Sequence, residues 1–244
     1  GLYVGQGAGL AGRVQVVEIG IPATAKLPAG IELLDRTWVK RHLPARPADA
    51  NKGTFGRVLV LAGSQFYVGA AALAAAGAYR VGAGLVTLAV PRSIQAMVAA
   101  RLVEATYLPL DEQDGALAPS VAPRVHDTLK GYDVLLAGCG LSTAAAEAVR
   151  AVLFGIGDMD LRGVVIDADG LNALVGVDGW AERLPARAVL TPHPGEMARL
   201  TGWTVQQIQA DRLAVARTFA QRWRVVVVLK GANTVVAAPD GRMW

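Results

Sequence analysis

The sequence predicts an α/β protein with three layers, α/β/α, around a mainly parallel sheet. Short runs that are apolar throughout alternate with helical patterns, and polar or glycine-rich turns follow the runs. Strands buried on both faces read as continuous apolar runs, and helices between them supply the crossovers that parallel pairing needs. An apolar content of 53% and a charged content of 18% are typical of a well-packed globular protein.

The expected strands and helices alternate from residue 51 onward. Each expected strand is rich in Val, Leu or Ile and lies between turn residues. These strands are 57–62, 85–90, 132–137, 163–167, 187–190 and 225–229. The expected helices are 69–81, 93–101, 120–130, 143–154 and 204–222. A second β-branched run at 234–238, after a tight turn, predicts an antiparallel strand near the edge of the sheet.

The first 50 residues have a different character. A Gly-rich segment is followed by an expected strand at 13–19, which Gly20 and Pro22 end. Residues 23–50 are rich in proline and charge, which predicts a domain boundary near residue 25. The chain starts at Gly1 and stops at Trp244, and we interpret it as a fragment of a longer protein.

Charge and cysteine content exclude several classes of protein. The net charge is +4, and the basic residues are scattered apart from a Pro-containing stretch at 36–46. A solvated linker or helix face is favoured there over a nucleic-acid patch. One cysteine, Cys139, excludes an internal disulfide and predicts a reducing cytoplasm. Arg80 interrupts the apolar region 69–90, which predicts a packed helix and strand and no membrane span.

Five turns that follow expected strands are candidates for ligand contact. In such folds ligands bind beyond the carboxyl ends of the strands, where helix N-termini present free N–H groups. Each turn alone also fits a structural role, such as a plain strand–helix connection, but five of them at one rim favour a site. The turns are 63–70, 138–143, 167–172, 191–196 and 230–234.

The polar residues of these turns leave alternatives open. His193 is held between two prolines, which makes it a better ligand candidate than a lone histidine. Glu196 either favours the dipole of the helix that follows or holds magnesium through water. Asp169 is explained by helix capping or by contact with a hydroxyl group or cation. Lys230 suits a phosphate, or is a solvated lysine in a β-turn. Cys139 fits a small buried apolar role better than a nucleophile.

Seven segments of the chain together carry a resemblance. They are Lys52–Gly56, Ala62–Ser64 with Gly69–Ala70, Arg80–Gly84, Gly138–Leu141, Asp167–Asn172, Thr191–Glu196 and Leu229–Thr234. They occur in the order found in ADP/ATP-dependent NAD(P)H-hydrate dehydratases, which have a ribokinase-like fold, and the chain resembles this family over about residues 35–244. Residues 1–22 resemble the last strand of the NAD(P)H-hydrate epimerase domain of bifunctional bacterial versions. The resemblance divides the chain into 1–25, the tail of an epimerase domain plus linker, and 26–244, a dehydratase domain missing its C-terminal part.

The resemblance implies a lyase that repairs nicotinamide nucleotides in the cytoplasm. Its substrate is the S-form of hydrated NADH or NADPH; ADP or ATP, with magnesium, phosphorylates the ring hydroxyl, and loss of phosphate restores the double bond. By the family's pattern, Ala70, Gly140 and His193 line the hydrated dinucleotide, Glu196 lies near magnesium, and Asp169 is a possible further contact. The adenine nucleotide binds at Lys230, Gly231, Ala232, Asn233 and Thr234. The family is often homo-oligomeric, and neither a nucleic acid nor a membrane is an expected partner.

Two departures from the family's pattern keep other readings open. Cys139 stands where the family usually has proline. The Gly-rich segment with the catalytic Asp is absent, so no catalytic residue is assigned, and this Asp is expected beyond Trp244. One alternative is a small-molecule kinase of the same fold, although such relatives usually have Asn where His193 stands. Another is a catalytically inert chain that at most binds nucleotide.

Overall fold

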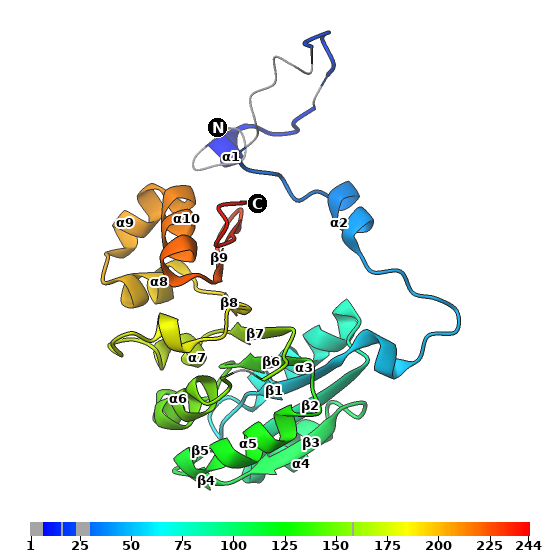
Figure 1. The fold of residues 1–244 in the computed structure, drawn as a ribbon, viewed down its shortest axis with the longest axis vertical. Helices are drawn as coiled ribbons and strands as arrows, with labels where there is room; N and C mark the ends of the chain where they lie inside the picture. Colours follow the sequence, from blue (N-terminus) through cyan, green and yellow to red (C-terminus); the bar gives the residue numbers. More distant parts are fainter. Residues whose placement is uncertain (1–6, 16, 23–29, 158) are drawn as a thin grey trace.

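An eight-stranded sheet forms the centre of the molecule in the structure, a computed structural model that describes residues 7–15, 17–22, 30–157 and 159–244 (Figure 1). The strand order is β10-β9-β8-β7-β6-β1-β2-β3, and all neighbours are parallel except β9 and β10. The strands are β1 (Arg57–Leu61), β2 (Leu85–Pro91), β3 (Thr106–Leu110), β6 (Val134–Ala137), β7 (Gly163–Ile166), β8 (Ala188–Leu190), β9 (Val226–Leu229) and β10 (Val235–Ala237). The predicted α/β class, its mainly parallel sheet and the antiparallel return strand are confirmed.

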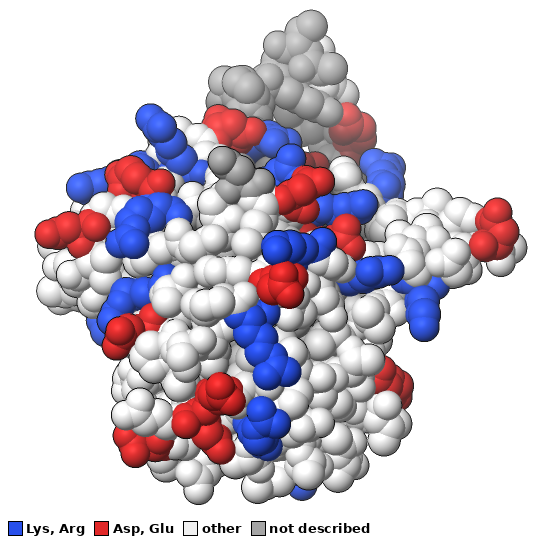
Figure 2. Space-filling view, turned by 60° about the horizontal axis from the view of Figure 1, so that its bottom comes forward, with Lys and Arg blue, Asp and Glu red and all other residues white. Residues whose placement is uncertain are grey.

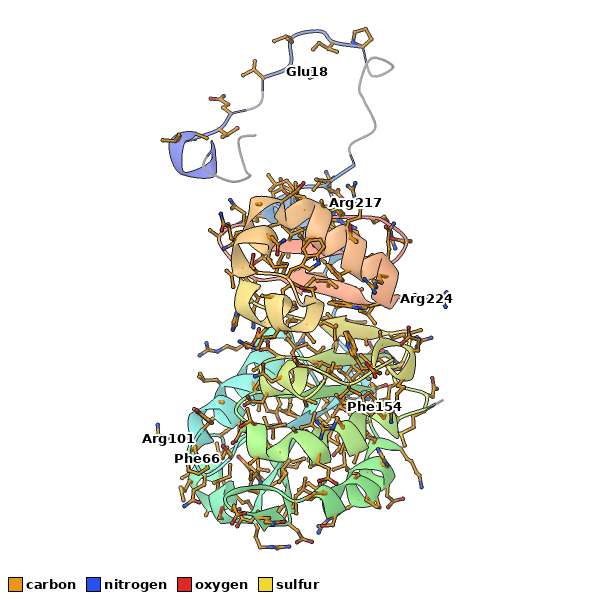
Figure 3. The ribbon with its side chains drawn as sticks, turned by 90° about the vertical axis from the view of Figure 1, so that its left-hand side faces the viewer. Glu18, Phe66, Arg101, Phe154, Arg217 and Arg224 are labelled. Carbon is orange, nitrogen blue, oxygen red and sulfur yellow. The ribbon has the colours of Figure 1, made fainter. Side chains whose placement is uncertain are left out.

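Helices lie on both faces of the sheet. They are α3 (Val68–Val81), α4 (Gln95–Ala99), α5 (Ala122–Leu129), α6 (Ala146–Phe154), α7 (Asp169–Asn172), α8 (Pro194–Thr201), α9 (Val205–Ala210) and α10 (Arg212–Trp223). Short 3-10 helices lie at Lys52–Phe55, Arg92–Ile94, Pro119–Val121, Thr143–Ala145 and Ala181–Arg183. Figure 3 shows α8, α9 and α10 gathered around the β9 end of the sheet, while α3 to α6 lie around the other strands.

Neighbouring residues of β1 enter two separate cores. Leu59 and Leu61 pack in a first core with residues of α5, α6 and α10. Val60 packs in a second core with residues of α3 and α4. Successive side chains of a strand point to opposite faces, so β1, between β6 and β2 in the sheet, is buried on both sides as the sequence predicts.

The strands beyond β6 are less buried than their apolar sequences predict. In β7, β8 and β9 the residues of the first core alternate with half-buried residues such as Val165, Val189 and Val228. The helices of the second core, α3 and α4, contact β1, β2 and β3. One face of β7 to β9 is therefore only partly covered.

Three regions differ from the sequence-based expectation. β3 was not expected, and neither was a hairpin of β4 (Glu112–Gln113) and β5 (Ala116–Leu117). The single helix expected at 204–222 is two helices, because Asp211 leaves the helical conformation and caps α10 by accepting a hydrogen bond from Ala214 N. A break at an N-capping residue changes the direction of the chain without ending the helical layer.

The N-terminal part contributes little regular structure among its described residues. It contains α1 (Gly7–Leu10) and α2 (Arg36–His42). The strand expected at 13–19 is not formed by the residues of this range that are described; a strand needs a pairing partner to be stable. The boundary expected near residue 25 lies outside the described residues.

Acidic and basic side chains are interspersed over the face of the molecule that Figure 2 shows. Among the described residues, no helix combines the length and apolar character that a membrane-spanning segment needs.

Candidate functional site

The turns after β1, β6 and β7 lie in contact at the carboxyl edge of the sheet. Gly63 N donates a hydrogen bond to Cys139 O over 2.9 Å, which joins the first two turns. Ser142 N donates to Asp169 Oδ2 over 2.9 Å, which joins the second and third. The convergence that parallel strands predict is therefore present, and Asp169 serves as a partner of a neighbouring turn.

Ala70 and Gly140, two residues expected at the dinucleotide, are direct neighbours. A Cβ added to Gly140 would lie 2.6 Å from Ala70 Cβ and 2.7 Å from Tyr67 Cβ. Gly140 also has a φ of +67°, a conformation that glycine adopts without strain. Close packing of the turn against α3 thus explains why glycine stands at this position.

His193 and Glu196 form a reciprocal cap at the start of α8. His193 Nδ1 accepts hydrogen bonds from Gly195 N (2.9 Å) and Glu196 N (3.2 Å). Glu196 Oε2 accepts from His193 N (2.7 Å). A ring nitrogen that accepts two N–H groups carries no proton, so the ring hydrogen of His193 lies on Nε2. His193 Nε2 lies 3.4 Å from Glu196 Oε1, and the His193 side chain is 50% exposed.

Lys230 connects the ends of β7, β8 and β9. Its Nζ lies 2.6 Å from Asp167 Oδ1 and 3.7 Å from Glu196 Oε2. Its backbone N donates to Pro192 O over 2.9 Å. Two carboxylates thus lie beside one ammonium group, and the Lys230 side chain is still 39% exposed. The structure therefore links the expected nucleotide segment with the turns expected at the dinucleotide.

The turn after β9 is held by an arginine that the sequence analysis did not find. Arg212, at the start of α10, donates through Nη1 to Ala232 O (2.8 Å) and through Nη2 to Leu229 O (2.9 Å). Thr234 Oγ1 donates to Gly231 O over 3.2 Å within the same turn. No local motif announces the Arg212 contacts, because they depend on how α10 packs against β9.

Magnesium finds few ligands at this edge. The side chain of Glu196 is 6% exposed, and one of its oxygens is already an acceptor in the α8 cap. Across the described part of the chain, no three His, Cys, Asp or Glu side chains form a group that could hold a metal ion. The helix-terminal role of Glu196 is seen directly, and its magnesium role stays a prediction.

The sulfur of Cys139 faces the same carboxylate as Lys230. Cys139 Sγ lies 3.9 Å from Asp167 Oδ2. Burial, reinforced by the Asp167 charge, raises the pKa of the Cys139 thiol from 9.0 to about 11. The thiol is therefore neutral at physiological pH, which fits the predicted packing role and not a nucleophile.

The fold of the chain is that of ribokinase-like α/β proteins. A ribokinase-like superfamily protein from Enterococcus faecalis superposes with a TM-score of 0.72, at 22% identity, over 89% of this chain and 72% of its own. Residues 58–244 match the NAD(P)H-hydrate dehydratase family. The chain belongs to that family.

Named relatives agree with this assignment. A bifunctional NAD(P)H-hydrate repair enzyme from Moorella thermoacetica is 42% identical over 100% of this chain and 46% of its own length. An ADP-dependent (S)-NAD(P)H-hydrate dehydratase from Bacillus subtilis is 35% identical over 85% of this chain and 71% of its own. The chain spans about half the length of several of the curated relatives it matches.

A solved structure extends the comparison to three dimensions. The crystal structure of the ADP/ATP-dependent NAD(P)H-hydrate dehydratase from Bacillus subtilis, co-crystallized with ATP and Mg²⁺, superposes with a TM-score of 0.69. The match has 32% identity and covers 89% of this chain and 73% of that one.

Proposed function

We propose that the protein catalyses the ADP- or ATP-dependent dehydration of the S-form of hydrated NADH and NADPH. The observation that carries the proposal is the match of residues 58–244 to the dehydratase family. In this chain the motif-bearing turns also meet at one edge, where Lys230 joins them through Asp167. In the reaction, a phosphoryl group passes to the ring hydroxyl, and loss of phosphate restores the double bond.

The residues present fit an anionic nucleotide and a dinucleotide beside it. We assign the adenine nucleotide to Lys230–Thr234, where Lys230 and Arg212 supply positive charge next to a turn of small residues. We assign the hydrated dinucleotide to Ala70, Gly140 and His193, and Asp169 remains a possible further contact. His193 Nδ1 is an acceptor in the α8 cap, so its Nε2 is the donor, and the dinucleotide would replace Glu196 Oε1, which lies 3.4 Å from Nε2. A donor held in this way orients a substrate.

The donors of this edge do not fit a directly bound magnesium ion. Glu196 is nearly buried and serves the α8 cap. We therefore propose that Glu196 acts on magnesium only through water, while the ion accompanies the nucleotide phosphates and neutralises their charge.

The test of the function is recovery of the NADH absorbance that the intact reduced ring has and the hydrate lacks. The full-length protein is mixed with hydrated NADH, magnesium and either ADP or ATP. We expect absorbance to return only when nucleotide is present, with release of inorganic phosphate. No nucleotide-dependent recovery would contradict the proposal, and a stable phosphorylated product would favour a small-molecule kinase.

We further propose that residues 26–244 belong to the dehydratase domain and 1–25 to the end of an epimerase domain plus linker. The support is that several relatives are bifunctional repair enzymes and that the Moorella match covers the whole chain. An assay for epimerisation of the R-hydrate by the full-length protein tests this division. A cytoplasmic location and a homo-oligomer are part of the same proposal, and size-exclusion chromatography with light scattering tests the second.

A further inference from the structure

The guanidinium group of Arg212 spans the turn that joins β9 to β10. Its two terminal nitrogens donate to Leu229 O and Ala232 O, which are the carbonyls on either side of Lys230 and Gly231. α10 lies beside β9 in the fold (Figure 1). A planar guanidinium can hold two carbonyls at a fixed separation, which an ammonium group cannot do. One side chain thus fixes both ends of the turn.

Gly231 is adapted to this contact. A Cβ added to Gly231 would lie 2.7–2.8 Å from three atoms of the Arg212 guanidinium. These are the three nearest atoms, and Gly231 also has a φ of +153°, so both the arginine and the backbone conformation disfavour a larger residue here. Glycine at position 231 therefore allows the guanidinium to lie directly against the backbone of the turn.

The charge of Arg212 is poorly compensated. Its Nε is buried and has no hydrogen-bond partner, and within the described ranges no carboxylate lies within ion-pairing distance of it. Burial lowers the pKa of the guanidinium, although an arginine stays charged. Keeping such a charge unpaired costs free energy. Lys230, in contrast, is already paired with Asp167.

We infer that Arg212 is the positioning residue of the nucleotide segment: it sets the conformation of residues 230–234 and adds an uncompensated positive charge beside it. This inference rests on the proposed function only in taking the ligand of the segment to be an adenine nucleotide. A phosphate-bearing ligand would find there a turn already in one conformation, which lowers the entropy cost of binding.

Two variants of Arg212 test the inference, because they separate its two hydrogen bonds to the turn from its positive charge. Arg212→Lys keeps the charge but reaches one carbonyl at most, and Arg212→Met keeps the length without charge or donors. We expect ADP affinity, measured by titration calorimetry in the full-length protein, to fall about tenfold in Arg212→Lys and further in Arg212→Met, because a charge-assisted hydrogen bond that holds the turn is lost in the first variant and both are lost in the second. Arg222→Lys is the matched control, because Arg222 lies exposed on the same helix.

Steady-state kinetics supply a readout that a general loss of stability does not produce. We expect the KM for ADP to rise in Arg212→Lys, while the KM for the hydrated dinucleotide and kcat at saturating ADP change less than about twofold, because the bridge acts on the nucleotide segment alone. An equal rise in the KM for ADP and the KM for the hydrated dinucleotide, or an unchanged ADP affinity, would overturn the inference.

A double-mutant cycle tests the contact itself. Gly231→Ala should weaken ADP binding strongly in the native background, because the new Cβ displaces the guanidinium. In an Arg212→Ala background the same change should cost less, since only backbone strain remains. Additive effects would show that the two residues act separately and would contradict the inference.

The inference and the proposed function can fail separately. If the wild-type protein binds ADP and the Arg212 variants bind it less tightly, the inference holds even when no dehydration is observed. If the wild-type protein binds no adenine nucleotide, the inference is wrong whatever the activity assay shows.

Discussion

Cys139 lies half-buried in the turn after β6, with its sulfur next to Asp167. A pKa of about 11 in place of 9.0 leaves about one hundredth as much thiolate at neutral pH, and the thiolate is the reactive form. We expect iodoacetamide to alkylate folded Cys139 about 100-fold more slowly at pH 8 than the urea-unfolded chain. Mass spectrometry against time provides the rates.

The same shift fixes the sign of a pH effect on stability. The folded thiol keeps its proton to higher pH than the unfolded thiol does. The stability that the protonated Cys139 contributes to the folded state is therefore complete below pH 9.0 and is lost as the pH rises through about 11. Asp167→Asn removes one cause of the raised pKa and should bring alkylation forward to lower pH. An alkylation rate that is equal in the folded and unfolded chain would contradict the burial of the thiol.

Lys230 is the residue on which the nucleotide assignment depends most directly. Lys230→Ala removes the cation between Asp167 and Glu196, so two carboxylates would face the incoming phosphates. We expect the KM for ADP to rise at least about tenfold, through loss of a charge-assisted interaction. Lys230→Arg keeps the charge, so its KM for ADP should lie between those of the wild-type protein and Lys230→Ala. Unchanged dependence on ADP concentration would mean that the turn is only structural.

At the scale of the element, α8 owes its start to one imidazole. His193→Ala removes the acceptor for Gly195 N and Glu196 N, and loss of a cap costs about 1 kcal/mol. His193→Asn restores an acceptor of the type preferred at this position. We expect urea unfolding to show a lower free energy of unfolding for His193→Ala and a nearly wild-type free energy of unfolding for His193→Asn.

The two variants also separate capping from substrate contact. If His193 contacts the hydrated dinucleotide, both variants raise the KM for the hydrated dinucleotide, although only His193→Ala lowers the stability of the protein. A KM that follows stability instead would assign His193 to the helix alone.

The β4–β5 hairpin and the strand β3 were missed in the sequence, for two different reasons. Asp114 and Gly115, both at positive φ, form the Asp-Gly turn of the β4–β5 hairpin, and this dipeptide is a strong hairpin signal. The sequence therefore contained that element. β3 contains Pro109, and proline argues against a strand except at an edge. β3 is such an edge strand, a position that only the assembled sheet reveals.

The candidate site was predictable only in part, for a related reason. Parallel strands bring their carboxyl ends to one edge, so the meeting of the turns followed from the order of strands and helices. The ion pair of Lys230 with Asp167 joins the ends of β9 and β7, which are separated in the sheet by β8. Arg212, in α10, contacts the turn after β9. Such contacts depend on side-chain packing between elements that are distant in sequence, and no spacing in the chain encodes them.

At the scale of the whole molecule, one sheet joins two cores, and their stabilities should therefore be coupled. Leu135 belongs to the first core and Leu88 to the second, and both are fully buried. Replacing either by alanine should cost about 2–5 kcal/mol. Leu73→Ala is the matched control, since Leu73 is 76% exposed and exposed substitutions usually change stability by less than about 0.5 kcal/mol.

Tryptophan fluorescence makes this coupling measurable. Trp180 and Trp223 are buried in the first core, so their emission reports on that face, whereas far-UV circular dichroism reports on all elements. Because β1 contributes residues to both cores, we expect Leu88→Ala to shift the fluorescence and dichroism transitions together, by the same amount of denaturant. A fluorescence transition that stays in place while dichroism shifts would mean that the two faces unfold separately, since cooperative unfolding requires coincident probes.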